Sequence, residues 1–353
     1  MTEQESAQKP AEKSAGKAAG KAAGKAAGKA AAAGGPPGRA LALAGRANVP
    51  SPASLALIGA AVLIVAVAGV TNESFLTEGN ITNLLRQMVT TGLLSLGMLL
   101  VILTGGIDLS VGSLVALTGI MSAGLVEGMP LPLAILAAII VGTLCGTVNG
   151  VLIARFSLAP FVVTLASMTT FRGLTYVYSR TPITPATPDF LTLGSQNIGA
   201  VPMAAVITLV LFAMGWVLVN RTAAGRALLG IGGNREAVRL AGVKVQRHLV
   251  LAYALSGLCA GVAGVILASR VGIAQPSVGQ GFELDAIAAC VIGGASLAGG
   301  RGTVGGTLAG VVLLGLIDNL LSLYDVQSYW QQVLKGVIIA VAILARRGER
   351  QST

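Results

Sequence analysis

"LTGGIDLSVGS", residues 103–113, places an aspartate, two serines and three glycines between two long apolar segments. The adjacent glycines permit a tight turn and close helix contact, and Asp108 and Ser110 can cap a helix that begins near Val111. In lipid every backbone polar group needs a partner, so a break here has to be satisfied internally. The stretch predicts a helix broken inside an apolar region, with a carboxylate at the break.

The rest of the chain is as apolar as the two flanks of this stretch. Of 353 residues, 54% are hydrophobic and only 11% are charged, with a mean hydropathy of +0.80, whereas a soluble domain carries about a quarter charged residues. Many apolar runs approach the ~20 residues that cross a bilayer as a helix. We expect an all-α, polytopic transmembrane helical bundle with broken helices. The expected spans are 53–70, 88–104, 111–127, 130–154, 157–178, 202–220, 248–270, 284–298, 303–323 and 331–345.

The number of spans depends on two short polar interruptions. Residues 105–110 separate the second and third segments, and "LAGGRGTVGG" separates the eighth and ninth. About ten spans are expected, and eight is the alternative. With ten, Lys and Arg gather on one side of the membrane together with both termini. This bias predicts a multi-pass protein of the bacterial cytoplasmic (inner) membrane, with both termini cytoplasmic.

Three regions follow from composition. Residues 1–50 hold a Lys/Ala/Gly-rich repeat of period four with no apolar face, so we expect a disordered cytoplasmic tail. Residues 51–347 are expected to form the transmembrane domain, with a cytoplasmic loop at 221–247, and residues 348–353 are expected to form a short cytoplasmic tail. The basic tail is interpreted as a positive-inside flank; a helix on an anionic membrane surface is the alternative. Nucleic acid is not an expected partner.

Several enzyme classes lack their motifs here. Cys145, Cys259 and Cys290 lie in apolar runs without a CxxC pair, and His248 is the single histidine. No Walker A loop is present, because the "GK" pairs of the tail are followed by Ala and not by Ser or Thr. We therefore expect no catalytic residues, no metal site and no cofactor on this chain.

The basic loop at 221–247 contains the most specific local pattern. "GGN" at 232–234 predicts a turn, and "REAVRLAG" then has helical spacing that ends at Gly242. A short amphipathic helix on the cytoplasmic face is expected. It is either a surface connector or a docking element for a cytoplasmic partner.

"REAVRLAG" resembles the Glu-Ala-Ala…Gly loop of bacterial ATP-binding-cassette importer permeases, with Glu236, Ala237 and Gly242 on the pattern and Val238 departing from it conservatively. From about residue 55 to 345, the chain resembles the ribose/monosaccharide branch, a family that also includes branched-chain amino acid permeases. The stretches that carry this resemblance are "VILTGGIDLSVGSLVALTG", "GTVNGVLIARF", "LAPFVVTLASMTTFRGLTYV", "GIGGNREAVRLAGV", "GFELDAIAACVIGGASLAGGRGTVGGTLAG" and "YWQQVLKGVIIAVAI".

The resemblance implies a permease subunit, not an enzyme, that forms the path for a monosaccharide such as a ribose-like pentose, a hexose or a related polyol. It implies as partners a second permease subunit (a homodimer), a cytoplasmic ATPase that binds ATP and Mg²⁺, and a periplasmic or lipid-anchored sugar-binding protein. The residues expected to couple the chain to the ATPase are Gly233, Asn234, Arg235, Glu236, Ala237, Arg239 and Gly242.

Polar residues inside the spans are candidates for the translocation path or for helix breaks. They are Asp108, Ser110, Asn149, Thr164, Arg172, Asp318 and Asn319. Asp108 either caps the broken helix or lines the path, and the two roles are compatible. Arg301 is expected on the same side of the membrane as a charge partner of Asp108. The spacing of Gly142, Gly146 and Gly150, and of Gly257 and Gly261, predicts tight helix packing.

A self-sufficient secondary transporter of a small polar solute is the alternative function, because such proteins also use broken helices. Energy coupling separates the two. A secondary transporter binds its substrate alone and responds to an ion gradient, whereas an importer subunit is inert without its ATPase.

Overall fold

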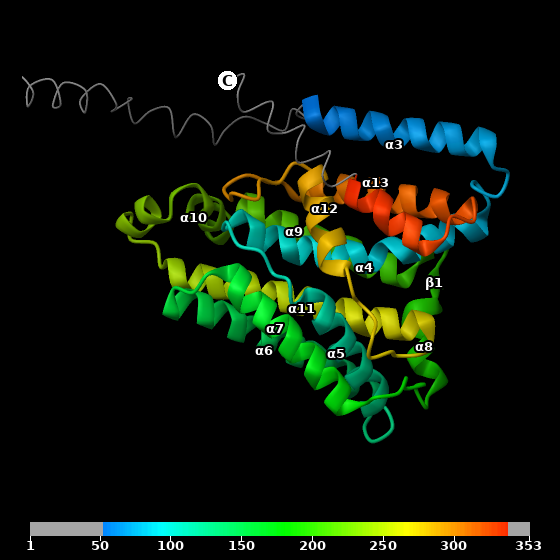
Figure 1. The fold of residues 1–353 in the computed structure, drawn as a ribbon, viewed down its shortest axis with the longest axis horizontal. Helices are drawn as coiled ribbons and strands as arrows, with labels where there is room; N and C mark the ends of the chain where they lie inside the picture. The colour runs from blue at the N-terminus through cyan, green and yellow to red at the C-terminus, as the bar shows by residue number, and fades with distance from the viewer. Residues whose placement is uncertain (1–51, 338–353) are drawn as a thin grey trace, which may run out of the picture. The chain divides into compact units, whose positions relative to one another are not determined.

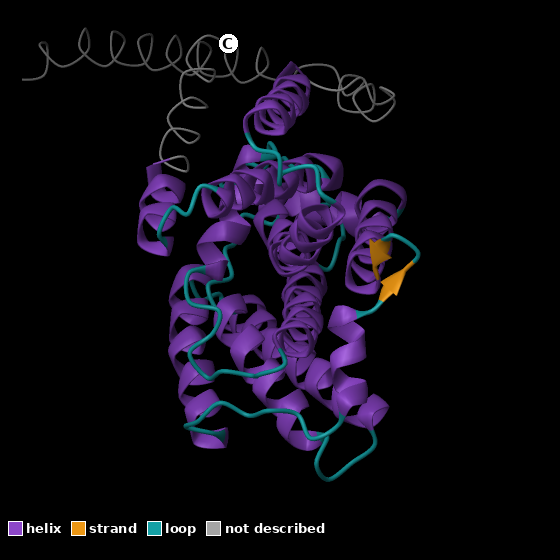
Figure 2. Cartoon of the chain, turned by 90° about the vertical axis from the view of Figure 1, so that its right-hand side faces the viewer, coloured by secondary structure: helices purple, strands orange, loops and turns teal. Residues whose placement is uncertain are grey.

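The computed structural model describes residues 52–337, and almost all of its regular structure is helical (Figures 1 and 2). The helices are α3 (Pro52–Thr71), α4 (Glu78–Leu103), α5 (Val111–Leu125), α6 (Leu131–Phe156), α7 (Pro160–Tyr178), α8 (Pro188–Ser195), α9 (Met203–Arg221), α10 (Ala223–Leu240), α11 (Val245–Val271), α12 (Phe282–Ile292) and α13 (Val304–Leu323). Residues 328–337 are also helical. The strands β1 (Asn197–Ile198) and β2 (Val201–Pro202) form an antiparallel pair. The predicted tails, 1–50 and 348–353, and the end of the tenth predicted span lie outside the described residues.

Within residues 52–337, five helices are long and apolar enough to cross a bilayer: α4, α6, α9, α11 and α13. This confirms the predicted all-α, polytopic membrane protein. The predicted break is also present, because α4 ends at Leu103 and α5 begins at Val111.

The eighth predicted span, 284–298, is wrong as a full crossing. Its helix, α12, has 11 residues, which at ~1.5 Å per residue covers about half of a ~30 Å hydrocarbon core. After Ile292 the chain turns through glycines with positive φ, among them Gly294 (φ 104°) and Gly299 (φ 86°). The apolar composition of 293–298 therefore reflects a partly buried turn and not the end of a transmembrane helix.

Helix ends follow local signals in the sequence. The hydroxyl of Thr77 accepts from the backbone N–H of Asn80 at the start of α4, and Thr303 does the same for Gly306 at the start of α13. The helices α6 and α7 both begin with a proline in the first turn, where its missing N–H costs nothing. These caps place the polar turns at the helix ends and leave the helix interiors apolar.

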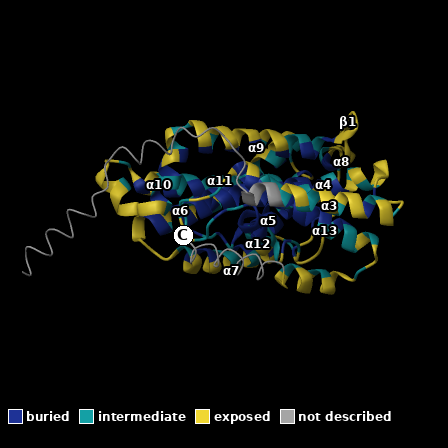
Figure 3. Ribbon diagram, turned by 90° about the horizontal axis from the view of Figure 1, so that it is seen from above, coloured by how far each residue is buried: buried dark blue, intermediate teal, exposed yellow. Residues whose placement is uncertain are grey.

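The core is built around α11, which packs against α4, α5 and α6. The buried residues follow these helices through the centre of the bundle (Figure 3). At the α6–α11 contact, an added Cβ on Gly142 would lie 3.0 Å from Cα of Gly261, and one on Gly146 would lie 3.0 Å from Cα of Gly257. The predicted glycine packing is confirmed, and it brings the two helix backbones close enough for side chains from both to meet at the break.

The ends of the bundle differ in character. The helix α10 lies at one end, whereas α8 and β1 lie at the other (Figure 1). The outer half of α10 is exposed, as is the turn between β1 and β2 (Figure 3). These two regions are the parts of the described chain best placed to meet other proteins.

Candidate functional site

The carboxylate of Asp108 is fully buried at the break between α4 and α5. Its Oδ1 accepts hydrogen bonds from the backbone N–H of Ser110 at 3.1 Å and from the Ser110 hydroxyl at 2.6 Å. Its Oδ2 accepts from the hydroxyl of Ser256 on α11 at 2.9 Å. The carboxylate thus closes the turn that leads into α5 and ties that turn to the central helix.

The network continues from Ser110 into α6 and α7. The side-chain amide of Asn149 donates to the Ser110 oxygen at 3.0 Å, and the hydroxyl of Ser167 donates to the amide oxygen of Asn149 at 2.5 Å. Thr164 donates to the carbonyl of Ile107 at 3.2 Å. Four of the predicted polar residues, Asp108, Ser110, Asn149 and Thr164, therefore gather around one break. We call this set, with Ser256 and Ser167, the break network.

The expected charge partner of Asp108 is wrong. Arg301 is exposed, and the Asp108 carboxylate accepts its hydrogen bonds from the two hydroxyls and the N–H named above. Hydroxyl and N–H donors satisfy a buried carboxylate without a second buried charge. The sequence placed Arg301 and Asp108 on the same side of the membrane, but the turn at 293–303 directs the arginine toward solvent.

A second polar cluster joins α12, α13 and the helical segment 328–337. The ammonium nitrogen of Lys335 lies 3.2 Å from Oδ2 of Asp285 and 3.0 Å from Oδ2 of Asp318. The three side chains are 16–22% exposed. One ammonium group thus faces two carboxylates, and within the described residues Oδ1 of Asp318 is buried without a hydrogen-bond partner. We call this set the ion cluster.

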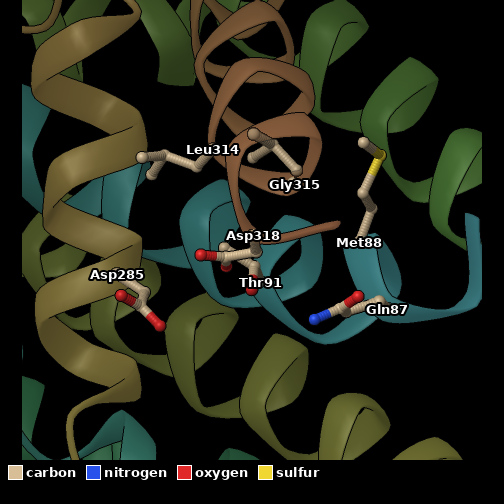
Figure 4. A pocket seen from close by; sticks show the side chains of 8 residues that line it. Gln87, Met88, Thr91, Asp285, Leu314, Gly315 and Asp318 are labelled. Carbon is tan, nitrogen blue, oxygen red and sulfur yellow. The ribbon is translucent and has the colours of Figure 1, made fainter. Parts of the chain in front are cut away.

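The ion cluster borders a small hollow against α4. Figure 4 shows Asp285 on one side, Gln87 and Met88 of α4 on the other, and Asp318 between them with Thr91 of α4 beside it. The hollow has a volume of about 10 Å³, which is the room for about one water molecule. Polar side chains on both sides make it suitable for a bound water.

The two remaining path candidates hold helices and loops together. The side-chain amide of Asn319 on α13 exchanges hydrogen bonds with that of Asn80 on α4, at 2.8 and 3.0 Å. Arg172 on α7 donates to the carbonyls of Pro276 and Val278, both at 2.7 Å. Arg172 therefore fixes the loop that precedes α12, a contact between segments far apart in the sequence.

The predicted coupling region forms α10 and its C-terminal turn. The expected turn at "GGN" is present as a kink: α10 consists of two helical halves, and Asn234 between them has non-helical φ and ψ of −157° and 97°. The side-chain oxygen of Asn234 accepts from the N–H of Ala237 at 2.9 Å and so caps the second half of the helix. Gly242 follows the helix with φ 80°, as expected for a residue that ends it.

The second half of α10 presents charges and one large apolar side chain. Arg235, Glu236 and Arg239 are exposed, and Leu240 is 76% exposed. The guanidinium of Arg239 donates to both carboxylate oxygens of Glu236, at 2.6 and 3.0 Å. This hydrogen bonding lowers the pKa of the Glu236 carboxyl below its usual value. Glu236 therefore stays ionised and partly paired at neutral pH.

Sequence reasoning did not place Ser256 or Asp285 among the site residues. Ser256 lies in the run "YALSGLCAG", where a single serine looks like a small packing residue. Asp285 lies near the start of α12, beside Glu283, where acidic residues are favoured by the helix dipole. Only the contacts across the bundle give these side chains a place in the two clusters.

A family model described as "Branched-chain amino acid transport system / permease component" matches residues 80–343. The chain belongs to this family. The permease is 46% identical over 289 residues to the ribose import permease protein of Bacillus subtilis, covering 81% of this chain and 90% of that protein. It is 41% identical over 292 residues to the ribose import permease protein of Escherichia coli K12, with 81% and 91% coverage.

A more distant relative is the xylose transport system permease protein of Escherichia coli K12, which is 34% identical over 337 residues. The match covers 77% of this chain and 86% of that protein. No solved structure matches the chain. The family match confirms the predicted class, an ATP-binding-cassette importer permease, and the chain is accordingly a transport subunit and not an enzyme.

Proposed function

We propose that this permease forms the translocation path for a monosaccharide, such as a ribose-like pentose, a hexose or a related polyol, and that a separate ATP-binding-cassette ATPase drives the import. The substrate class is supported by relatives named for ribose, allose and xylose. A periplasmic or lipid-anchored binding protein delivers the sugar. ATP and Mg²⁺ bind the partner ATPase, and a second copy of the chain completes the path.

The exposed half of α10 is the single observation that carries the proposal. It lies beyond the helical bundle at the end away from β1 (Figure 1), and it combines Leu240, 76% exposed, with Arg235, Glu236 and Arg239. An exposed helix that projects from the bundle and carries both charges and a large apolar side chain is available for a contact with another protein. Such a helix needs a partner outside the membrane, and the ATPase is that partner in our account.

A short polar stretch in the middle of α7 supports a polar path shared with a second copy. The exposed stripe of α6 includes Ile140 and Leu144, which suit lipid. On α7 the exposed positions Thr169, Thr170 and Gly173 are flanked by exposed apolar residues, among them Leu165 and Val177, and α7 is not among the five helices that are long and apolar enough to count as spans by composition. Small and hydroxylated side chains suit close helix contact and a path for a polyhydroxyl solute. We assign residues 169–173 of α7 to the path between two copies.

The proposal also sets the orientation. The Lys and Arg bias of the sequence places α10 and both termini in the cytoplasm and β1 outside, in a bacterial inner membrane. The opposite positions of α10 and β1 in the bundle agree with this orientation (Figure 1). A membrane-impermeant thiol reagent on intact cells should then label Ile198→Cys and should not label Leu240→Cys.

The test is sugar uptake into proteoliposomes that contain the permease with the ATPase and binding protein of its own host. With ATP enclosed on the side of α10, we expect uptake of radiolabelled D-ribose, D-allose or D-xylose that stops when ATP or the ATPase is omitted. Uptake by the permease alone, driven by a proton or sodium gradient, would show a secondary transporter instead and would overturn the proposal.

A further inference from the structure

Three backbone segments meet near the middle of α10, just before its kink. They are the C-terminal end of α4 at Leu103, the buried half of α10 at Gly232, and the turn after α12 at Gly299–Gly300. The backbone N–H of Gly300 donates to the carbonyl of Leu103 at 3.0 Å. This hydrogen bond joins the turn to α4, and Gly232 lies against both.

Gly232 has no room for a side chain at this junction. An added Cβ would collide with the carbonyl oxygen of Leu103 and the backbone nitrogen of Gly300, and it would lie 2.9 Å from the carbonyl carbon of Gly299. All three obstacles are backbone atoms, which cannot rotate away as a flexible side chain can. Gly233, the next residue of the helix, has open space around its added Cβ.

The junction leads directly into the break network. After Leu103 the chain turns at Gly105, which has φ 81°, and reaches Asp108. Gly106 lies against the side chain of Tyr253 on α11, and a Cβ added to Gly106 would collide with the Tyr253 hydroxyl. The segment between Leu103 and Asp108 is therefore confined at both of its ends and has little freedom to absorb a displacement.

The other side of the junction leads to the exposed part of α10. Leu228 and Ile231 anchor the buried half, at 0% and 3% exposed, while the helix beyond the kink at Asn234 is exposed. The exposed half begins at the kink, two residues after Gly232, so a force applied to it reaches Gly232 across Asn234. Packed backbones transmit such a displacement because close-packed interiors have low compressibility.

We propose that Gly232 is the positioning residue that couples α10 to the break between α4 and α5. A shift of α10 moves Leu103 and the Gly299–Gly300 turn together and thereby displaces the turn that holds Asp108. In the mechanism proposed above, this contact carries the motion of the ATPase to the membrane path. The inference rests on the proposed function only for that consequence, since the junction is a property of the chain alone.

The direct test is hydrogen–deuterium exchange of the purified permease in lipid nanodiscs. Gly232→Ala pushes the three backbones apart, so amide exchange over 101–110 and 296–302 should rise by about tenfold or more relative to wild type. Gly233→Ala is the matched control and should leave exchange in both segments unchanged. Equal amide exchange over 101–110 and 296–302 in the two variants would overturn the inference, as would a change of exchange in Gly232→Ala that is confined to α10.

A wild-type measurement covers the case in which Gly232→Ala does not fold. As the denaturing detergent SDS is added, protection of 227–233 and of 101–106 should be lost together, because the junction makes them one cooperative unit. Loss of protection at 227–233 while 101–106 stays protected would contradict the coupling.

The consequence for transport is measured separately in the ATP-driven D-ribose assay. Gly232→Ala should lower sugar transported per ATP hydrolysed by about tenfold while the amount of assembled complex stays at the wild-type level. Gly305→Ala on α13, where the added Cβ also meets open space, is the control and should transport normally. If Gly232→Ala transports as much sugar per ATP hydrolysed as Gly305→Ala, Gly232 is not a positioning residue. If the wild-type permease shows no ATP-driven uptake, the proposed function is refuted and the exchange result still stands.

Discussion

The break network and the ion cluster stabilise their carboxylates by different interactions. Asp108 is fully buried and takes its hydrogen bonds from serine hydroxyls and one backbone N–H. Asp285 and Asp318 share a single ammonium group, Lys335, and border a hollow. The first cluster has one charge and several neutral donors, and the second has three charges and few neutral donors.

The difference predicts different roles. A carboxylate held by neutral donors from several helices fixes a unique geometry, because each donor would be left unpaired if the arrangement changed. A cluster with an excess carboxylate beside a hollow responds to water, protons or a neighbouring cation. We therefore interpret the break network as the rigid joint of the permease and the ion cluster as a clamp between its C-terminal helices.

Replacing Asp108 should have the largest effect. Asp108→Leu leaves the hydroxyls of Ser110 and Ser256 and one backbone N–H without their acceptor in a fully buried site, which we expect to cost about 3 kcal/mol or more. Thermal unfolding in detergent and recovery of monodisperse protein are the readouts. Asp108→Asn keeps one acceptor oxygen and should be milder, and the exposed Asp189→Leu is the control. Equal stability of Asp108→Leu and wild type would show that the break does not depend on this carboxylate.

Removing the ammonium group of the ion cluster should have the next largest effect. Lys335→Met leaves two carboxylates facing one another, at an expected cost of about 2 kcal/mol, because uptake of a proton and partial exposure relieve part of the repulsion. The triple variant Lys335→Met, Asp285→Asn, Asp318→Asn should recover most of the lost thermal stability. If it is no more stable than Lys335→Met, the loss comes from packing of the lysine side chain and not from charge.

The outer edge of the break network should show the smallest effect. Ser167→Ala removes one donor to the amide oxygen of Asn149, for an expected loss of about 1 kcal/mol. Thr169→Ala on the same helix is the matched control, since the hydroxyl of Thr169 donates only within α7, to the carbonyl of Ala166, and the side chain is exposed. Indistinguishable unfolding temperatures for the two variants would exclude Ser167 from the network.

Much of the break was predictable from the sequence. Polar residues in a chain this apolar need partners, so Asp108, Ser110, Asn149 and Thr164 were singled out as a class. Their meeting at one place depends on the close approach of α6 to α11, which the glycine spacing at Gly142 and Gly146 also indicated. The sequence did not identify Ser256 as the donor to Oδ2 of Asp108. The rotation of α11 about its own axis decides which of its side chains faces the break.

Other features depend on tertiary structure and escaped prediction. Arg301 was expected beside Asp108, but membrane side alone does not fix the direction of a side chain that follows glycines with positive φ. The apolar run at 284–298 looked like a span because hydropathy does not separate a short buried helix and turn from a crossing helix. At "GGN" the sequence predicted a turn over three residues, whereas only Asn234 is singled out by non-helical φ and ψ.

The central claim is that a separate ATPase drives this permease through the exposed half of α10. The most direct measurement is site-specific photo-crosslinking in membranes that contain the active complex, with p-benzoylphenylalanine at Leu240 or at Ile198, an exposed aliphatic residue on β1 at the opposite end. We expect a crosslink to the ATPase from position 240 and no crosslink to the ATPase from position 198. A crosslink to the ATPase from position 198, or none from position 240 in a complex that imports sugar, would contradict this.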